Sequence, residues 1–288
     1  MSEHSALGRS RYLPRATGHG RMHYCTAGDG GITVLFEAGL GKSRSTWSLV
    51  QPQLTDSART VVYDRAGYGR SDPAPEPRTF EALLTDHLQV LDDVVDTPCI
   101  LVGHSYGGPI VRRAALARPE KVKGVVLVDE VPEIAGATLI DRSMGGATAF
   151  YRAQVALARV GLLSAAHRRT YFRRLTGSAL REAVDESGTV RAARTALAEW
   201  KQMIPGVKRL EATGPHFPRV PLTEITADRN GGSEPRADDF LYRAHHDIAE
   251  AAGGRHVVAT SSSHDIQLTE PRLVVEETLR MIDVVSST

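Results

Sequence analysis

The feature that most constrains the fold is a short apolar run that stops abruptly at a glycine. Residues 99–102 are all apolar, and Gly103 follows them directly. A run without polar alternation is typical of a strand that is buried on both faces of a parallel sheet. Helical spacing follows between residues 106 and 117. This stretch therefore predicts a buried strand, a sharp turn and a helix.

The same rhythm of strand and helix patterns extends along most of the chain. Alternating strands and helices imply right-handed crossovers and a mostly parallel sheet that is covered by helices on both faces, which is the α/β class. The Asp-Gly turn at residues 28–31 also predicts a hairpin between the first two strands. The predicted strands are residues 21–27, 32–36, 59–64, 99–102, 123–128, 221–227 and 256–259.

Strand patterns vanish in one long stretch near the middle of the chain. There the apolar residues recur at helical spacing, so we expect a helical insertion. The domains that we predict are a leader at 1–20, expected to be mobile, a core made of 21–131 and 218–288, and a helical cap at 132–217.

Composition excludes several classes of protein. The chain has 288 residues, 41% of them hydrophobic, which suits one large globular domain with an insertion. Its 35 basic and 34 acidic residues nearly cancel, so no overall charge draws it to nucleic acid or membrane, and any basic patch must be local. No run of about 18 apolar residues occurs, and no apolar targeting region starts the chain. We therefore expect a cytoplasmic protein with a small-molecule partner; the sequence does not indicate its oligomeric state.

The turn after the buried strand carries a recognisable motif. Residues 103–107 fit G-x-S-x-G, with Ser105 in the centre. Between a strand and a helix, this pattern predicts a nucleophile elbow. A serine at the apex of such a turn has strained backbone, so its neighbours must lack side chains, as Gly103 and Gly107 do. Because a serine hydroxyl is a poor nucleophile, the chemistry requires a base and an acid that orients the base.

His264 is the best placed of the eleven histidines to be that base. It follows the predicted strand 256–259 through a short loop and precedes a helix that begins near Pro271. Ligands of such sheets bind at the carboxyl ends of the strands, which is where this loop lies. The sequence therefore predicts Ser105 as nucleophile and His264 as general base and acid.

The elbow, the loop Gly39-Leu40-Gly41 and the pair Ser263-His264 together resemble the α/β-hydrolase superfamily. Residues 62–71 and 101–108 look like two of its most recognisable blocks, and the resemblance covers nearly the whole chain. It implies an α/β-hydrolase fold with a cap inserted after the sixth strand, as the family counts its strands. It also implies a serine hydrolase of the carboxylic ester type that forms an acyl-enzyme.

In this family the oxyanion is held by two backbone N–H groups. Here they map to Leu40 and Tyr106. One departure is that Ala38 stands where many members have histidine, which leaves open what holds the loop from outside. The family's haloalkane dehalogenases and epoxide hydrolases use aspartate at the elbow, so Ser105 argues against those reactions.

The acid has two candidates. The usual family position follows the strand 221–227 and falls near Asn230, with Asp228 two residues earlier. Asparagine cannot supply the charge that stabilises an imidazolium. A minority of the superfamily takes the acid from the end of the preceding strand, where this chain has Asp129. We therefore favour Asp129 and keep Asp228 as the alternative.

Other motifs are weaker, and none predicts a cofactor or a metal. Gly41-Lys42-Ser43 lacks the first glycine of a phosphate loop, because Phe36 stands at that position. The basic run 167–174 is either a solvated face or a positive rim that attracts an anionic substrate. Apolar residues of the insertion either line an acyl pocket or form the core of the cap; they include Phe150, Tyr151, Trp200 and Met203.

The function that these features predict is cleavage of an ester, a lactone or a thioester with a sizeable apolar body. Two alternatives stay open. One is a ligand-binding protein of this fold with little turnover, and the other is an acyltransferase or a cofactor-free lyase on the same fold.

Overall fold

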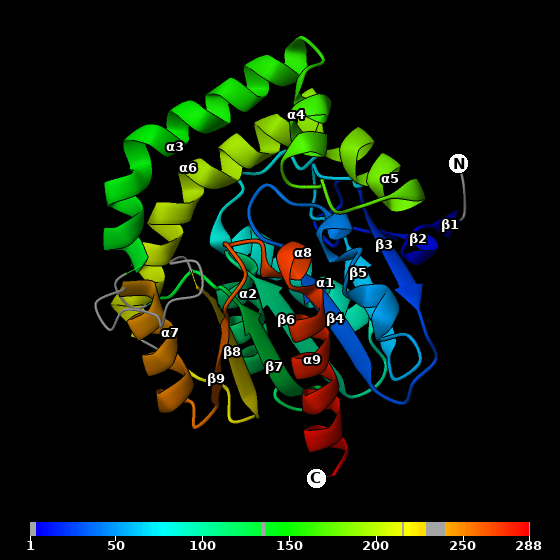
Figure 1. The fold of residues 1–288 in the computed structure, drawn as a ribbon, viewed down its shortest axis with the longest axis vertical. Helices are drawn as coiled ribbons and strands as arrows, with labels where there is room; N and C mark the ends of the chain where they lie inside the picture. The colour runs from blue at the N-terminus through cyan, green and yellow to red at the C-terminus, as the bar shows by residue number, and fades with distance from the viewer. Residues whose placement is uncertain (1–3, 134–135, 215, 229–239, 288) are drawn as a thin grey trace.

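The computed structural model describes residues 4–133, 136–214, 216–228 and 240–287. Within them, one nine-stranded sheet has the order β1-β2-β3-β5-β4-β6-β7-β8-β9 (Figure 1). Pairs from β5 through β4 to β9 are parallel, whereas β1, β2, β3 and β5 pair antiparallel, so the predicted mostly parallel sheet is confirmed. The strands are β1 (His4–Ser5), β2 (Gly8–Pro14), β3 (Arg21–Ala27), β4 (Thr33–Glu37), β5 (Arg59–Tyr63), β6 (Cys99–His104), β7 (Val122–Val128), β8 (Leu222–Ala227) and β9 (Arg255–Ala259).

Helices cover both faces of this sheet, as the strand and helix rhythm predicts. On β4, Val34 and Phe36 point to the face that is covered by α9 and by Trp47 of a short 3-10 turn. Leu35 points to the opposite face, where α1 and α2 pack. The helices are α1 (Phe80–Val94), α2 (Gly107–Ala117), α3 (Gly136–Arg159), α4 (Leu163–Arg169), α5 (Gly177–Ser187), α6 (Val190–Thr213), α7 (Phe240–Ala251), α8 (Ile266–Thr269) and α9 (Pro271–Ser286).

Helices α3 to α6 form an insertion between β7 and β8. Figure 1 shows them arching over the carboxyl ends of the parallel strands. Apolar side chains of α6, among them Trp200 and Met203, pack on Phe80 of α1 and Tyr106 of the elbow. β7 is the sixth strand when the two-residue β1 is left aside, so the insertion occurs where the resemblance places it. Among the described residues, no helix is long and apolar enough to cross a membrane.

Two expectations about the amino-terminal region are corrected. Residues 8–14, assigned to the leader, form β2, which pairs antiparallel with β3. This strand lies between the two-residue edge strand β1 and β3, and it exposes several side chains, including Arg9 and Arg11, so it has no apolar pattern that would predict it. The predicted hairpin is also wrong, because β5 lies between β3 and β4 and pairs with both.

Gly103 provides a test of the packing under the elbow. A Cβ atom there would lie 2.6 Å from Cγ2 of Val111 and 2.7 Å from the carbonyl oxygen of Gly107. We expect Gly103→Ala to lower the free energy of unfolding in urea by about 1–3 kcal/mol, the usual cost of overpacking. The control is Gly146→Ala in α3, where a Cβ meets nothing within 4 Å and helix propensity should raise stability slightly. Equal effects of the two substitutions would contradict this view of the elbow.

Candidate active site

Ser105 lies in the turn between β6 and α2, and its backbone is strained. Its φ is +53°, and among the described non-glycine residues only Asp129, at +45°, shares a positive φ. The Ser105 N–H donates to the carbonyl oxygen of Val128 at 3.0 Å, and its own carbonyl accepts from Gly108 and Val131 at 2.9 and 3.1 Å. The end of β7 therefore holds the serine in the elbow conformation that the motif predicts.

Two glycines let the loop after β4 pack directly on this elbow. A Cβ on Gly107 would lie 2.7 Å from the carbonyl oxygen of Glu37, and one on Gly39 would lie 2.7 Å from Nδ1 of His104. Neither contact leaves room for a side chain. Leu40 follows Gly39 and lines the same cavity as the serine.

His264 bridges two of the predicted site residues. Its Nε2 lies 2.9 Å from Oγ of Ser105, and its Nδ1 lies 2.6 Å from Oδ2 of Asp129. Asp129 is 1% exposed, its N–H donates to the carbonyl of Ile225 at 2.7 Å, and its Oδ1 accepts from the N–H of Ala227 at 3.0 Å. The carboxylate is therefore fixed by β8 and can orient the imidazole.

His104 supports the loop that carries His264. Its Nε2 donates to the carbonyl oxygen of His264 at 2.9 Å, and the two rings lie 4.8 Å apart. Burial and the neighbouring His264 lower the pKa of His104 to about 4, so its ring is neutral near pH 7. A neutral ring can donate this bond without placing a second positive charge beside His264.

The alternative acid lies on the next strand end. Asp228 is buried after β8, and its backbone N–H donates to the carbonyl of Ala259 at 2.9 Å. The carboxylate within hydrogen-bond distance of Nδ1 of His264 is that of Asp129. Asn230, which the usual family position suggests, lies outside the described residues.

Ser105 and His264 line a cavity of about 270 Å³ beneath the cap. Leu40 lies in its wall, and Tyr106 precedes the first turn of α2, where helix N–H groups are free to bind an anion. The wall is mostly apolar; its other residues are Lys42, His104, Val131, Tyr151, Tyr171, Trp200, Met203 and Asp265.

Arg65 is a residue of the site that sequence reasoning missed. Its guanidinium is 1% exposed and donates to the carbonyl oxygens of Ala38 and Gly39 at 2.5 and 2.8 Å. Arg65 therefore holds the loop that carries Leu40. In this loop Ala38 stands where many family members have histidine, so the arginine supplies hydrogen bonds from outside the loop. Arg65 belongs to the recognised block 62–71, but nothing in a single sequence signals that an arginine is buried.

The same guanidinium joins this loop to the cap. Arg65 binds Glu37 of β4 at 2.6 Å and Glu199 of α6 at 2.9 Å, and the hydroxyl of Tyr68 also donates to Glu199 at 2.9 Å. Burial raises the pKa of Glu37, but Arg65 and His87 outweigh it, so the pKa lies below its usual value. Glu37 therefore stays ionised and paired inside the protein.

Lys42 is a second residue with an unexpected place. Its Nζ lies 3.4 Å from the carboxylate of Asp265 and 3.4 Å from the ring centre of Tyr171. All three side chains line the cavity. Burial lowers the pKa of Lys42, and Asp265 partly offsets that effect. Lys42 of the glycine-lysine-serine motif is therefore a cationic side chain in the cavity wall.

The basic run 167–174 behaves as a solvated face. His167 and Phe172 are buried, whereas Arg168, Arg169 and Arg173 are exposed. None of these arginines lines the Ser105 cavity. The alternative of a positive rim at the cavity itself is therefore not supported.

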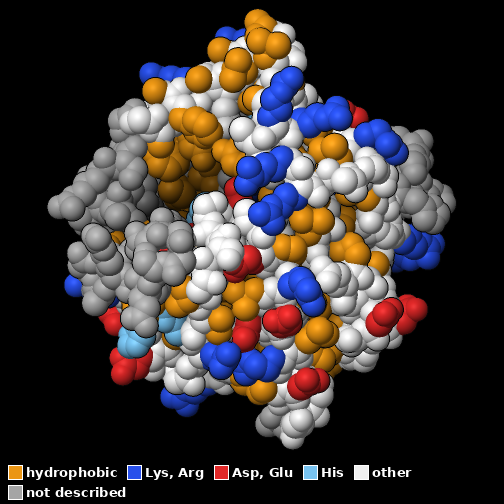
Figure 2. Space-filling model, in the orientation of Figure 1, with side chains coloured by type: hydrophobic (Ala, Val, Ile, Leu, Met, Phe, Trp, Pro, Cys, Tyr) orange, Lys and Arg blue, Asp and Glu red, His pale blue; other side chains and the backbone are white. Residues whose placement is uncertain are grey.

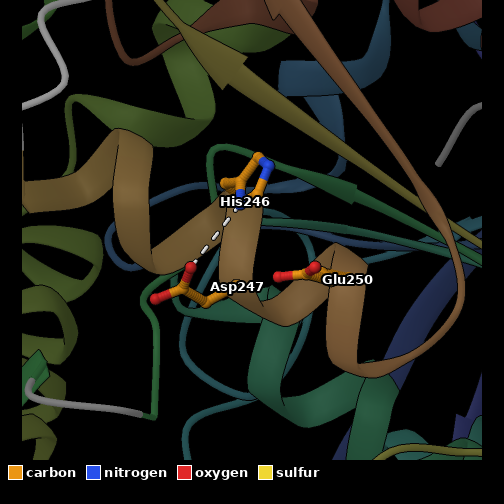
Figure 3. Close-up of side chains that lie close together, drawn as sticks. All are labelled: His246, Asp247 and Glu250. Atoms are coloured by element: carbon orange, nitrogen blue, oxygen red, sulfur yellow. Dashed lines mark ion pairs between the residues drawn. The ribbon is translucent and has the colours of Figure 1, made fainter.

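One group of described side chains has the spacing of a metal site. His246, Asp247 and Glu250 lie together on α7, all exposed, and Nδ1 of His246 is 3.5 Å from Oδ1 of Asp247 (Figure 3). Exposed acidic groups of this kind are common without a metal, and none of the three lines the Ser105 cavity.

A mostly parallel sheet, a strained serine after a central strand and a helical cap define a capped α/β protein with a candidate site at the serine turn. The alpha/beta hydrolase fold family model matches residues 32–202, more than half of the chain. The chain therefore belongs to the α/β hydrolase fold family.

Similar proteins differ in what their names say they do. The chain is 31% identical over 109 residues to the karrikin insensitive 2 receptor CA of Petunia hybrida, covering 36% of this chain and 40% of the receptor. It is 44% identical over 66 residues to the human mitochondrial palmitoyl-protein thioesterase ABHD10, covering 23% and 22%. The ligand-free structure of the epoxide hydrolase CorEH has a TM-score of 0.70 at 18% identity, covering 96% of this chain and 99% of that one. The matches span less than half the length of these curated relatives.

Arg65 can be tested for its role in holding the loop and cap. Lysine keeps the charge but cannot reach two carbonyls and two carboxylates together, so Arg65→Lys should lower the free energy of unfolding by about 3–5 kcal/mol, as for a broken buried ion pair. The control is Arg118→Lys, whose exposed pair with Asp92 should cost under about 1 kcal/mol. Urea denaturation measures both, and a loss at Arg65 no larger than that at Arg118 would refute the role.

Proposed function

We propose that this protein is a serine hydrolase that cleaves an ester, a lactone or a thioester through an acyl-enzyme. The observation that carries the proposal is the pair of hydrogen bonds that His264 makes, one to Ser105 and one to Asp129, at a cavity under the cap. A nucleophile, a base and an orienting acid in this arrangement are what acyl transfer requires.

In the first half-reaction, Oγ of Ser105 attacks the carbonyl carbon while Nε2 of His264 takes the hydroxyl proton. Asp129 orients the ring and stabilises the imidazolium that forms. The N–H groups of Leu40 and Tyr106 bind the oxyanion, and each such donor lowers the barrier by about 3 kcal/mol. His264 then gives its proton to the departing alcohol or thiol, which leaves the acyl group on Ser105.

In the second half-reaction, water replaces the leaving group. His264 accepts a proton from the water as it attacks the acyl carbon, and the tetrahedral intermediate is held by the same two N–H groups. Its collapse releases the carboxylic acid and returns the proton to Ser105. This sequence needs no cofactor.

The wall of the cavity favours a substrate with an apolar body. Trp200 and Met203 are each 6% exposed; they form part of the core between cap and sheet and also line the cavity. Tyr151 and Val131 extend the apolar surface. Trp200 and Met203 therefore belong both to the core of the cap and to the wall of the cavity, the two roles that the sequence left open. Phe150, by contrast, is exposed.

A second candidate is a ligand-binding protein that turns over slowly. The observation that favours it is the similarity to the petunia receptor. The likeness to an epoxide hydrolase concerns the fold alone, and Ser105 stands where that group of the family uses aspartate.

Covalent labelling tests the nucleophile. We expect a fluorophosphonate probe to add once to the wild-type chain, at Ser105, in intact-mass spectra. Ser105→Ala removes the acceptor and His264→Ala removes the base, so both should abolish labelling. Ser57→Ala, in the exposed turn before β5, should leave labelling unchanged. Absence of wild-type labelling would contradict the proposal, and labelling without multiple turnover of esters would favour the receptor.

Exchange of each acid for its amide tests the assignment of Asp129. Asp129→Asn should lower kcat on a p-nitrophenyl ester by about 10⁴-fold, because the amide favours the wrong histidine tautomer. Asp228→Asn is the matched control and should cost far less. If Asp228→Asn abolished turnover and Asp129→Asn did not, Asp228 would be the acid.

A further inference from the structure

The cap carries a charge imbalance that the chain as a whole does not have. Residues 142–181 contain eight arginines and no aspartate or glutamate, while the net charge of the protein is +1. Arg168, Arg169 and Arg173 are all exposed, and no ion pair within the described residues involves any of the three. Although the whole chain is nearly neutral, the cap therefore carries a local basic patch.

The same segment holds the exposed large hydrophobic side chains found among the described residues. They are Phe150, Leu157, Val160 and Leu162, with Val160 67% and Leu162 56% exposed. α3 ends at Arg159, and around Gly161, which has a positive φ, a 2.9 Å hydrogen bond from the N–H of Leu162 to the carbonyl of Leu157 closes a capping motif that commonly pairs these two positions. That motif accounts for Leu157 and Leu162, but it gives no reason for the exposure of Val160.

A hollow of about 650 Å³ adjoins this apolar end of α3. Its lining includes Gly161, beside Val160, and the three arginines at positions 168, 169 and 173. Phe172 and Leu180 contribute apolar surface between them. Guanidinium groups bind phosphate through paired hydrogen bonds, so three of them around one hollow suit a phosphate group that is attached to an apolar body.

We propose that this surface, the cap tip formed by Val160, Leu162 and the hollow of Arg168, Arg169 and Arg173, docks on an anionic lipid surface. Figure 2 shows apolar side chains gathered at the top of the molecule, over the end of α3, with basic side chains beside them. The apolar residues enter the boundary between headgroups and acyl chains, and the arginines bind the lipid phosphates.

Charge and polarity distinguish this partner from others. A second copy of the chain would bring two arginine-rich tips together, which like charges oppose. A nucleic acid would satisfy the arginines but would leave Val160 and Leu162 without an apolar partner. An anionic lipid surface satisfies both kinds of side chain. The inference does not rest on the proposed catalysis, because docking and turnover are measured separately.

Sedimentation with vesicles tests the docking. We expect the full chain to bind vesicles of phosphatidylcholine mixed with phosphatidylglycerol and to leave vesicles of phosphatidylcholine alone, with binding weakened by salt. The triple variant Arg168→Gln, Arg169→Gln, Arg173→Gln should bind on the order of a hundredfold more weakly. The control is a triple variant in which the exposed Arg9, Arg11 and Arg272 are replaced by glutamine. It loses the same charge and should bind like the wild type.

A second pair of variants tests the apolar part. Val160→Ser should weaken binding roughly tenfold, because the side chain would no longer enter the lipid, whereas Ala156→Ser, at an exposed position of the same helix, should not. The far-UV circular dichroism spectrum should be unchanged in all five proteins, which shows that they are folded. Equal binding to neutral vesicles, no binding to either, or no effect of Val160→Ser would overturn the proposal. So would a concentration-dependent dimer in light scattering that Val160→Ser abolishes.

Discussion

The candidate site depends on two turns of backbone that have the left-handed conformation, at Ser105 and Asp129. Such conformations cost about 1–3 kcal/mol each for residues other than glycine, so they persist only where the surroundings hold them. Here the support comes from the next strand of the sheet: Val128 of β7 binds the N–H of Ser105, and Ile225 of β8 binds the N–H of Asp129. The register of β6, β7 and β8 therefore sets the distance between the serine and the acid, and His264 fits between them.

Arg65 extends this dependence to the loop and the cap. One guanidinium contacts two carbonyls of the loop that carries Leu40, Glu37 of the sheet and Glu199 of α6. Because these groups are buried together, a movement of the cap helix that withdraws Glu199 leaves a charge without its partner inside the protein, which is costly. The position of Leu40, the proposed oxyanion donor, and the position of the cap are therefore coupled through a single side chain.

The sequence predicted what depends on local pattern and missed what depends on distant contacts. The fold class is confirmed, and the turn at Ser105 and the loop of His264 follow from which residues end predicted strands. The preference for Asp129 over Asp228 came from the family resemblance, because both residues end predicted strands, and it stays a prediction. β2 was missed because exposed side chains such as Arg9 and Arg11 leave it without an apolar pattern. The Asp-Gly turn suggested a hairpin because turn chemistry is local, whereas the insertion of β5 between β3 and β4 is decided by the whole sheet. The carboxylate partners of the buried Arg65 lie 28 and 134 residues away in the chain, at Glu37 and Glu199, and no pattern at short range records them.

Lys42 and Asp265 complete the set of contacts that fix the site. Lys42 lies two residues after Leu40, and Asp265 comes directly after His264, so their ion pair joins the loop that carries Leu40 to the loop that carries His264. Their side chains are only 13% and 18% exposed, and the ring of Tyr171 from the cap covers the ammonium group. Water screens such a pair less than it screens a surface pair, so the attraction acts across the cavity wall. The elbow, the histidine loop and the glycine loop are thus each tied to a neighbour by a buried polar contact. The polar groups of the cavity are therefore held in place by the protein itself.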